Sequence, residues 1–133
     1  MIKFKDYSFE CPHCHHQLSN HDGKVIFQTR YGDQMEKQGT IFLSPVIGDY
    51  KYRHEPDFNF AKGTLVQFEC PKCSKDLTST KNSDFVYIVM KVTPEIQFDV
   101  YFSRKAGSHK TYVVTENGPE TYGESNERIE ELH

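Results

Sequence analysis

The stretch Phe9–Ser19 reads FECPHCHHQLS, and a closely related stretch, FECPKCSKDLT, occupies Phe68–Thr78. Six of the eleven positions are identical in the two copies, and together the copies contain all four cysteines of the 133-residue chain. A repeat that uses every cysteine points to a shared site rather than to packing. We therefore expect the fold to be organised around these two copies.

Each copy contains a Cys-x-x-Cys pair with proline after the first cysteine. Such a pair in a tight turn brings two thiolates together, and two facing turns supply four sulfurs in a tetrahedron. The proline leaves the following backbone amides free to point at the sulfurs. Because four thiolates fill the coordination shell of zinc, one structural Zn²⁺ ion is predicted. Its predicted ligands are Cys11, Cys14, Cys70 and Cys73.

In these two stretches the chain resembles the zinc ribbon class of proteins, whose knuckles commonly read CPxCGxxL. The Phe-Glu pair before each knuckle is expected to form a strand, and Leu18 and Leu77 are expected to pack beneath the turns. The intervening 55 residues are many more than in the smallest ribbons. His15 and Ser74 stand where the class usually has glycine, so positive φ is expected at both positions.

The rest of the chain predicts a mainly β fold of antiparallel sheet, with short or no helices. Residues 24–31 alternate between two faces, and residues 96–102 do the same. Residues 85–92, FVYIVMKV, are apolar on both faces, which is typical of a central strand. Residues 48–63 are predicted to form a surface loop or an irregular edge. Further strands are predicted at 7–10, 40–46, 64–69 and 110–114.

Composition suggests one domain followed by a tail. Only 36% of residues are apolar but 14% are aromatic, which predicts a modest, aromatic core that benefits from a metal. Residues 115–133 contain six glutamates and one arginine, a net charge of −5, so the remaining residues carry +2 of the total of −3. We expect a zinc-ribbon-like domain over residues 1–115 and an acidic, flexible tail over residues 116–133, with at most a short helix at its end.

The sequence also bears on location. No apolar leader begins the sequence, and no run approaches the length of a membrane span, so a cytoplasmic protein without membrane contact is expected. Thiols stay reduced in that compartment, which favours metal binding over disulfides.

The cysteines have two alternative uses. CPHC also occurs as the redox motif of thioredoxin-fold disulfide oxidases, but that motif needs a helix directly after it, and HHQLSNHDG allows barely two turns. The disulfide-oxidase interpretation also leaves the second Cys-x-x-Cys copy unexplained. Iron in a rubredoxin-like electron carrier would use the same four thiolates, so iron stays an alternative to zinc.

Histidines gather around the first knuckle. A second metal site was weighed against a solvated turn whose partial positive charge offsets the zinc tetrathiolate, and the solvated turn is preferred because no carboxylate pattern completes a site. His54 and His109 are predicted to be isolated surface residues. The histidines of the first knuckle are His13, His15, His16 and His21.

The chain lacks the common catalytic motifs, such as G-x-S-x-G, a P-loop and H-E-x-x-H, so a non-enzymatic protein is expected. The acidic residues Asp49, Glu55 and Asp57 are interpreted as a solvated face rather than as paired catalytic carboxylates. No small-molecule substrate is evident from these patterns.

Two basic clusters are candidates for anion or nucleic-acid contact. Lys51 and Arg53 lie in the central loop. The second cluster surrounds the turn at residues 106–108 and consists of Arg104, Lys105, His109 and Lys110. The favoured function is a zinc-stapled interaction or regulatory module with a protein partner. A nucleic-acid-binding zinc ribbon is the second hypothesis and the electron carrier is the third.

Overall fold

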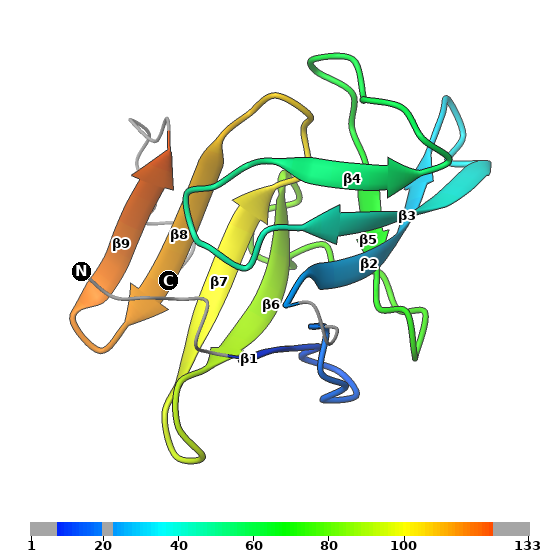
Figure 1. The fold of residues 1–133 in the computed structure, drawn as a ribbon. Coiled ribbons are helices and arrows are strands. Elements are labelled where there is room, and N and C mark those ends of the chain that lie inside the picture. The colour runs from blue at the N-terminus through cyan, green and yellow to red at the C-terminus, as the bar shows by residue number, and fades with distance from the viewer. Residues whose placement is uncertain (1–7, 20–22, 124–133) are drawn as a thin grey trace.

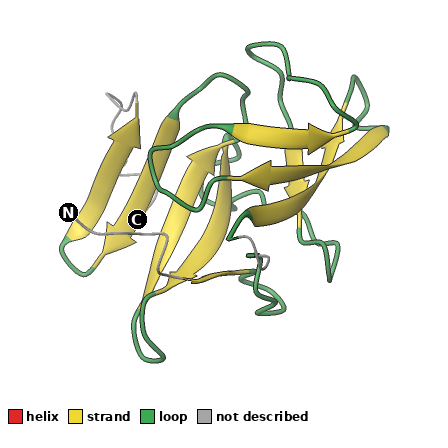
Figure 2. Ribbon diagram, viewed as in Figure 1, coloured by secondary structure: helices red, strands yellow, loops and turns green. Residues whose placement is uncertain are grey.

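The computed structural model describes residues 8–19 and 23–123, and this part of the chain folds into two antiparallel sheets without helices (Figures 1 and 2). The predicted mainly β fold is therefore confirmed. None of the described residues forms a helix long and apolar enough to span a membrane. The strands are β1 (Ser8–Glu10), β2 (Val25–Tyr31), β3 (Lys37–Leu43), β4 (Tyr52–Glu55), β5 (Gln67–Glu69), β6 (Phe85–Lys91), β7 (Gln97–Ser103), β8 (Lys110–Thr115) and β9 (Gly118–Gly123).

The strand order shows that the two strands that lead into the Cys-x-x-Cys turns pair with distant parts of the chain. Strand β1 pairs with β6 from the second half of the chain, and β5 pairs with β2 from the first half. One sheet has the order β1-β6-β7-β8-β9 and the other has the order β4-β3-β2-β5. Strand β6, which contains the FVYIVMK run, lies between β1 and β7 and is therefore an interior strand of its sheet, although β7 is the central one.

The two halves share one plan, because β1 to β4 and β5 to β8 repeat the same pairing pattern. Phe9 of β1 pairs with Met90 of β6, and Phe68 of β5 pairs with Thr29 of β2. The hairpins β2-β3 and β6-β7 each contain seven registered pairs. The eleven-residue sequence repeat is therefore the most visible part of a longer structural repeat, and β9 is an addition to its second half.

Equivalent ion pairs link each strand before a cysteine turn to its partner strand, β5 to β2 and β1 to β6. Arg30 Nε lies 2.8 Å from Glu69 Oε2, and Lys91 Nζ lies 3.6 Å from Glu10 Oε2. Each glutamate precedes the first cysteine of its copy. Partly exposed pairs of this kind contribute about 0 to 1 kcal/mol each, so they support the register more than they stabilise the fold.

The core lies between the two sheets and is aromatic at its centre. In β2 every second residue from Val25 to Tyr31 is buried, as expected for a strand with one face toward the core. The rings of Phe27, Phe68 and Phe102 contact one another, with centroids 5.2 to 5.8 Å apart. Phe102 belongs to the five-stranded sheet and the other two to the four-stranded sheet, so this cluster ties the sheets together.

His54 differs from its predicted place on the surface. It lies in β4, within the segment expected to be a loop or irregular edge, and only 1% of its surface is exposed. Its Nδ1 lies 2.9 Å from the carbonyl of Pro56 and its Nε2 lies 2.8 Å from Thr29 Oγ1. Because a carbonyl only accepts, Nδ1 carries a proton and donates to Pro56, while Nε2 shares a hydrogen bond with the threonine hydroxyl. The surface prediction was wrong because these partners satisfy the ring in the interior.

The end of the chain also differs from the prediction. Strand β9 lies inside the segment 116–133 that was expected to be a flexible tail, and it pairs with β8 along its whole length. Tyr122 of this strand packs against the core. Residues 124–133, including the predicted terminal helix, lie outside the described residues.

Candidate metal centre

Each Cys-x-x-Cys turn closes a short hairpin. The amide of Leu18 donates to the carbonyl of Phe9 at 2.7 Å, and the amide of Leu77 donates to the carbonyl of Phe68 at 2.9 Å. Leu18 and Leu77 are 2% and 1% exposed, so both are buried as predicted. The strand before each turn and the leucine after it therefore anchor the cysteines to the core.

The backbone of the two turns is the same. The amides of His15 and Ser74 donate to the carbonyls of Cys11 and Cys70, both at 2.9 Å. The predicted positive φ is present at His15 and Ser74, with 64° in each case. These residues adopt a left-handed conformation that glycine would take at lower cost, which explains why glycine is usual there in the class that the two stretches resemble.

The four sulfur atoms lie together, and two of the distances between them match the edges of a tetrahedral metal site. All four are within 4.8 Å of one another. Cys11 Sγ is 3.8 Å from Cys73 Sγ, and Cys14 Sγ is 3.7 Å from Cys70 Sγ. A zinc–sulfur bond of about 2.3 Å gives a tetrahedron with sulfur–sulfur edges of about 3.8 Å. The cysteines are unpaired as disulfides, and they form a site able to bind a metal ion.

Backbone amides point at the sulfurs of the first cysteine in each turn. His13 N lies 3.4 Å from Cys11 Sγ, and Lys72 N lies 3.4 Å from Cys70 Sγ. These contacts are the ones expected after a Cys-Pro pair, and they stabilise negative charge on sulfur. The repeat therefore supplies both the sulfur atoms and their supporting hydrogen bonds.

The thiols differ in burial and acidity when no metal is bound. Burial raises the pKa of Cys70 to about 12, and burial also raises the pKa of Cys11. Cys14 is exposed, and a hydrogen bond with the His16 backbone is the main cause that lowers its pKa to about 7. At neutral pH the buried thiols keep their protons until a cation replaces them. Metal binding therefore releases protons from the buried pair.

The predicted alternatives for this region find little support in the geometry. Residues 15–19 and 23–31 contain no helix after the CPHC turn, which the disulfide-oxidase motif needs. His13 and His15 are exposed, and His16 is partly exposed. None of these three belongs to the group of metal-ligating atoms, and His21 lies outside the described residues.

Arg104 does not fit the predicted basic surface. It is 9% exposed, its Nε donates to the carbonyl of Val66 at 3.1 Å, and its Nη1 donates to the carbonyl of Ser83 at 2.9 Å. Its guanidinium therefore joins two loops inside the molecule. The two backbone carbonyls occupy two of its N–H donors, which makes Arg104 a poorer candidate for anion contact than the sequence suggests, and such contact stays a prediction.

The other basic residues lie nearer the solvent. Lys51 and Lys105 are exposed and Lys110 is partly exposed. Arg53 Nη1 lies 2.6 Å from Glu55 Oε2, and its guanidinium carbon is 3.9 Å from the centre of the Phe42 ring. These contacts hold Arg53 against its own sheet. Anion or nucleic-acid contact by these residues and by His109 stays a prediction.

The three carboxylates that were interpreted as a solvated face differ in their contacts within the described part of the chain. Asp49 accepts a hydrogen bond from the Lys51 amide at 3.2 Å, the first cause of its lowered pKa. Glu55 pairs with Arg53, and Asp57 is exposed.

The structure brings together two residues that sequence reasoning did not connect. The rings of Tyr50 and His109 are stacked with centroids 4.6 Å apart and planes within 5°. Tyr50 precedes β4 and His109 precedes β8, so this contact joins the two predicted basic clusters. No local pattern signals it, because the residues are far apart in sequence and only the pairing of the sheets aligns their loops.

Arg104 gives a first testable prediction. Changing Arg104→Lys should lower the free energy of unfolding by about 2 kcal/mol, because one ammonium group cannot reach both carbonyls in the guanidinium geometry. Urea unfolding would measure the change, with Lys105→Ala as an exposed control expected to stay within about 0.5 kcal/mol of the original protein. Equal stability of Arg104→Lys and the original chain would contradict this role.

Fold and site together define an all-β protein in which two antiparallel sheets meet at a candidate four-cysteine metal centre. No protein-family model, curated protein or solved structure matches the chain. The resemblance to zinc ribbons therefore rests on the two repeated stretches, and the part of it that the structure supports is the cluster of four cysteines.

Proposed function

We propose that the four cysteines bind one zinc ion as a structural centre and that the chain is a non-enzymatic interaction module stapled by that ion. The observation that carries this proposal is the cluster of four sulfurs within 4.8 Å of one another, two from each half of the chain, with two of the distances at 3.7 and 3.8 Å. Four thiolates leave zinc no open position for water or substrate, which argues against a catalytic ion.

The size of the zinc contribution supports a structural role. Structural zinc bound by cysteines has an apparent binding free energy on the order of 10 kcal/mol, which is comparable to the stability of a whole domain. The metal would join the turn after β1 to the turn after β5, at a point where the two sheets meet. A centre in this place holds the relative position of the sheets as well as the two turns.

The two other functions weighed from the sequence receive less support. Arg104 donates hydrogen bonds to two backbone carbonyls inside the molecule, so the predicted nucleic-acid surface has fewer available cations. An iron centre has the same ligands and the same spacing, so the ligand geometry does not separate an electron carrier from a zinc-stapled module. Metal analysis separates them.

The full-length protein, expressed in medium containing both metals, should carry one zinc per chain and be colourless. Elemental analysis gives the stoichiometry, and the visible spectrum reports ferric tetrathiolate. Thiol titration under native conditions should be slow until a chelator is added. A red protein with one iron per chain would favour the electron carrier, and four rapidly reacting thiols without metal would refute the metal centre.

Weak retention on heparin at moderate salt is expected of a module with a protein partner, whereas strong salt-dependent retention would favour nucleic acid.

A further inference from the structure

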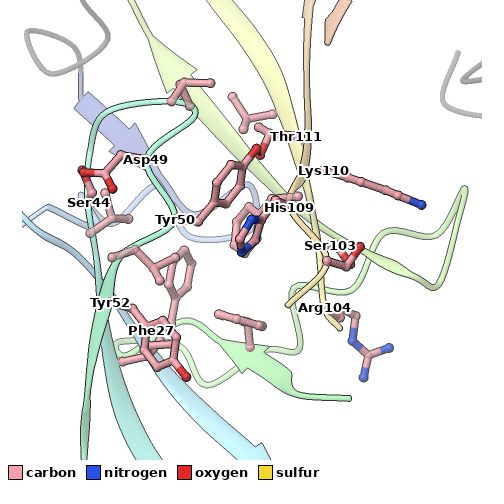
Figure 3. A pocket seen from close by; sticks show the side chains of 18 of the residues that line it. Phe27, Ser44, Asp49, Tyr50, Tyr52, Ser103, Arg104, His109, Lys110 and Thr111 are labelled. Atoms are coloured by element: carbon pink, nitrogen blue, oxygen red, sulfur yellow. Dashed lines mark hydrogen bonds between the residues drawn. The ribbon is translucent and has the colours of Figure 1, made fainter. Parts of the chain in front are cut away.

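A cavity of about 160 Å³ lies between the two sheets (Figure 3). Its walls come from both halves of the chain and include the loop that precedes β4 and the loop that precedes β8. The metal ligands are not among its lining residues. The cavity is therefore a second feature of the fold, separate from the cysteine cluster.

The strand residues that line the cavity are mainly hydrocarbon. Phe27, Phe68 and Phe102 contribute rings that contact one another in pairs. An apolar wall of this kind offers no compensation for a buried charge, so it excludes ions and favours a neutral molecule. The branched aliphatic residues that line the cavity are Val25, Ile41, Leu43, Ile88 and Val100 from strands, and Val46, Ile47 and Val66 from loops.

The polar and charged groups that line the cavity come mainly from the loops that precede β4 and β8, which together are called the rim. Tyr50 and His109 are stacked there, and the Tyr50 hydroxyl is 3.0 Å from Thr111 Oγ1. Figure 3 shows the charged ends of Arg104 and Lys110 pointing away from the space enclosed by the other side chains. The rim therefore supplies hydroxyl and imidazole groups for hydrogen bonds. Its other charged residues are Lys105, which is exposed, and Asp49, which accepts a hydrogen bond from the Lys51 amide.

The volume of the cavity and its lining side chains limit the size and the chemistry of the ligand that it can bind. A cavity of about 150 Å³ lined by leucine, isoleucine and phenylalanine side chains is known to stay dry and to accept benzene, and the present volume is close to that value. Aromatic walls favour a flat ring through edge and face contacts. A molecule that fills the space also recovers the packing contacts that an open cavity lacks.

We propose that this cavity binds a compact, neutral molecule built on one aromatic ring system, with a single hydrogen-bonding substituent directed toward Tyr50 and His109 at the rim. This inference goes beyond the proposed zinc-stapled module, because it concerns a small-molecule site that does not use the metal. It also differs from the sequence patterns, in which no small-molecule ligand was evident.

The test is a titration of the metal-loaded full-length protein with indole, followed in the methyl spectrum of the protein. Saturable one-site binding is expected, with the largest shifts at the methyl groups of Val66, Ile88 and Val100, which line the cavity. Benzoate, a ring that carries a charge, should bind at least about tenfold more weakly than indole, because the wall cannot compensate a carboxylate. Equal binding of benzoate, or shifts located elsewhere, would overturn the proposal.

Two variants fill the cavity, and one matched variant does not. Val66→Phe and Val100→Phe place a ring into the space and should abolish saturable indole binding. Val89→Phe makes the same exchange in β6 at a residue that does not line the cavity, and it should keep the affinity of the original protein within about twofold.

Dispersion of the amide spectrum reports whether each variant folds. If only one filling variant folds, that variant and the comparison of indole with benzoate decide the outcome. Retained binding in a folded filling variant would refute the site, and so would an equal loss of binding in Val89→Phe.

Discussion

Replacing Cys70 by serine is expected to release the metal and to unfold most of the described chain. Cys70 has no exposed surface, and its sulfur is 3.7 Å from that of Cys14. A serine hydroxyl is a poor substitute for a thiolate ligand, and the loss of a metal contribution on the order of 10 kcal/mol would equal or exceed the stability of an ordinary domain. Near-ultraviolet circular dichroism, the melting temperature and the zinc content together measure the effect.

A matched change in the same turn distinguishes loss of a ligand from general sensitivity. Ser74→Gly keeps all four sulfurs and places glycine at a φ of 64°, so it should retain the metal and be at least as stable as the original protein. Cys11→Ser should behave like Cys70→Ser because the two cysteines hold equivalent places in the repeat. A folded Cys70→Ser protein with an unchanged melting temperature and no metal would rule out a structural centre.

The second large effect is expected at Gly39, in the middle of β3. A Cβ atom built at this position would lie 2.6 Å from the carbonyl oxygen of Glu55 and would overlap the ring of His54. Both neighbours belong to the adjacent strand β4, and one is backbone, so there is little room for relief. We expect Gly39→Ala to lower the free energy of unfolding by about 3 kcal/mol, through overpacking and the displacement of His54 from Thr29.

Chemical denaturation of three proteins tests this expectation. Gln38→Ala changes the preceding, exposed residue of the same strand and should have an effect below about 0.5 kcal/mol. The double variant Gly39→Ala with His54→Ala should be less destabilised than the sum of its single changes, because the smaller side chain removes part of the overlap. Additive single and double effects would show that His54 is not what excludes a side chain at Gly39.

The candidate metal site was predictable because its information is local. Each Cys-x-x-Cys pair, its proline and its leucine fall within one short stretch, and the two positive φ angles followed from comparing His15 and Ser74 with the usual glycine. Strands β2 and β6 were also recognisable, since alternation and a continuous apolar run are properties of the strand itself.

The position of β3 was less accurate, because turn geometry sets the register of a hairpin. The sequence suggested a strand over residues 40–46, whereas β3 spans Lys37–Leu43. The preceding turn uses positive φ at Gly32 and Met35, which lets the chain reverse early and start pairing at Lys37. The strand then ends before Pro45, as expected for a residue without an amide proton.

Residues with distant partners were the ones that sequence reasoning misplaced. His54 depends on Thr29, and Arg104 depends on Val66, so the burial of each is decided by contacts across the fold. The sequence did not predict strand β9 for a related reason. Its glycine, proline and glutamate residues are poor strand formers, and it is ordered by pairing with β8 rather than by its own propensity.

The exchange of β1 and β5 between the halves limits how such a chain could have arisen. A gene encoding one half would specify a polypeptide with only two of the four thiolates and with its first strand paired to nothing in its own hairpin. Two identical copies would complete each other around a twofold axis, and each would supply half of the metal ligands. Duplication and fusion of that gene would turn an obligate homodimer into a single chain, after which the copies could diverge. The additional strand β9 and the buried His54, whose counterpart in the second half is the buried Val113, are differences of the kind that fusion permits.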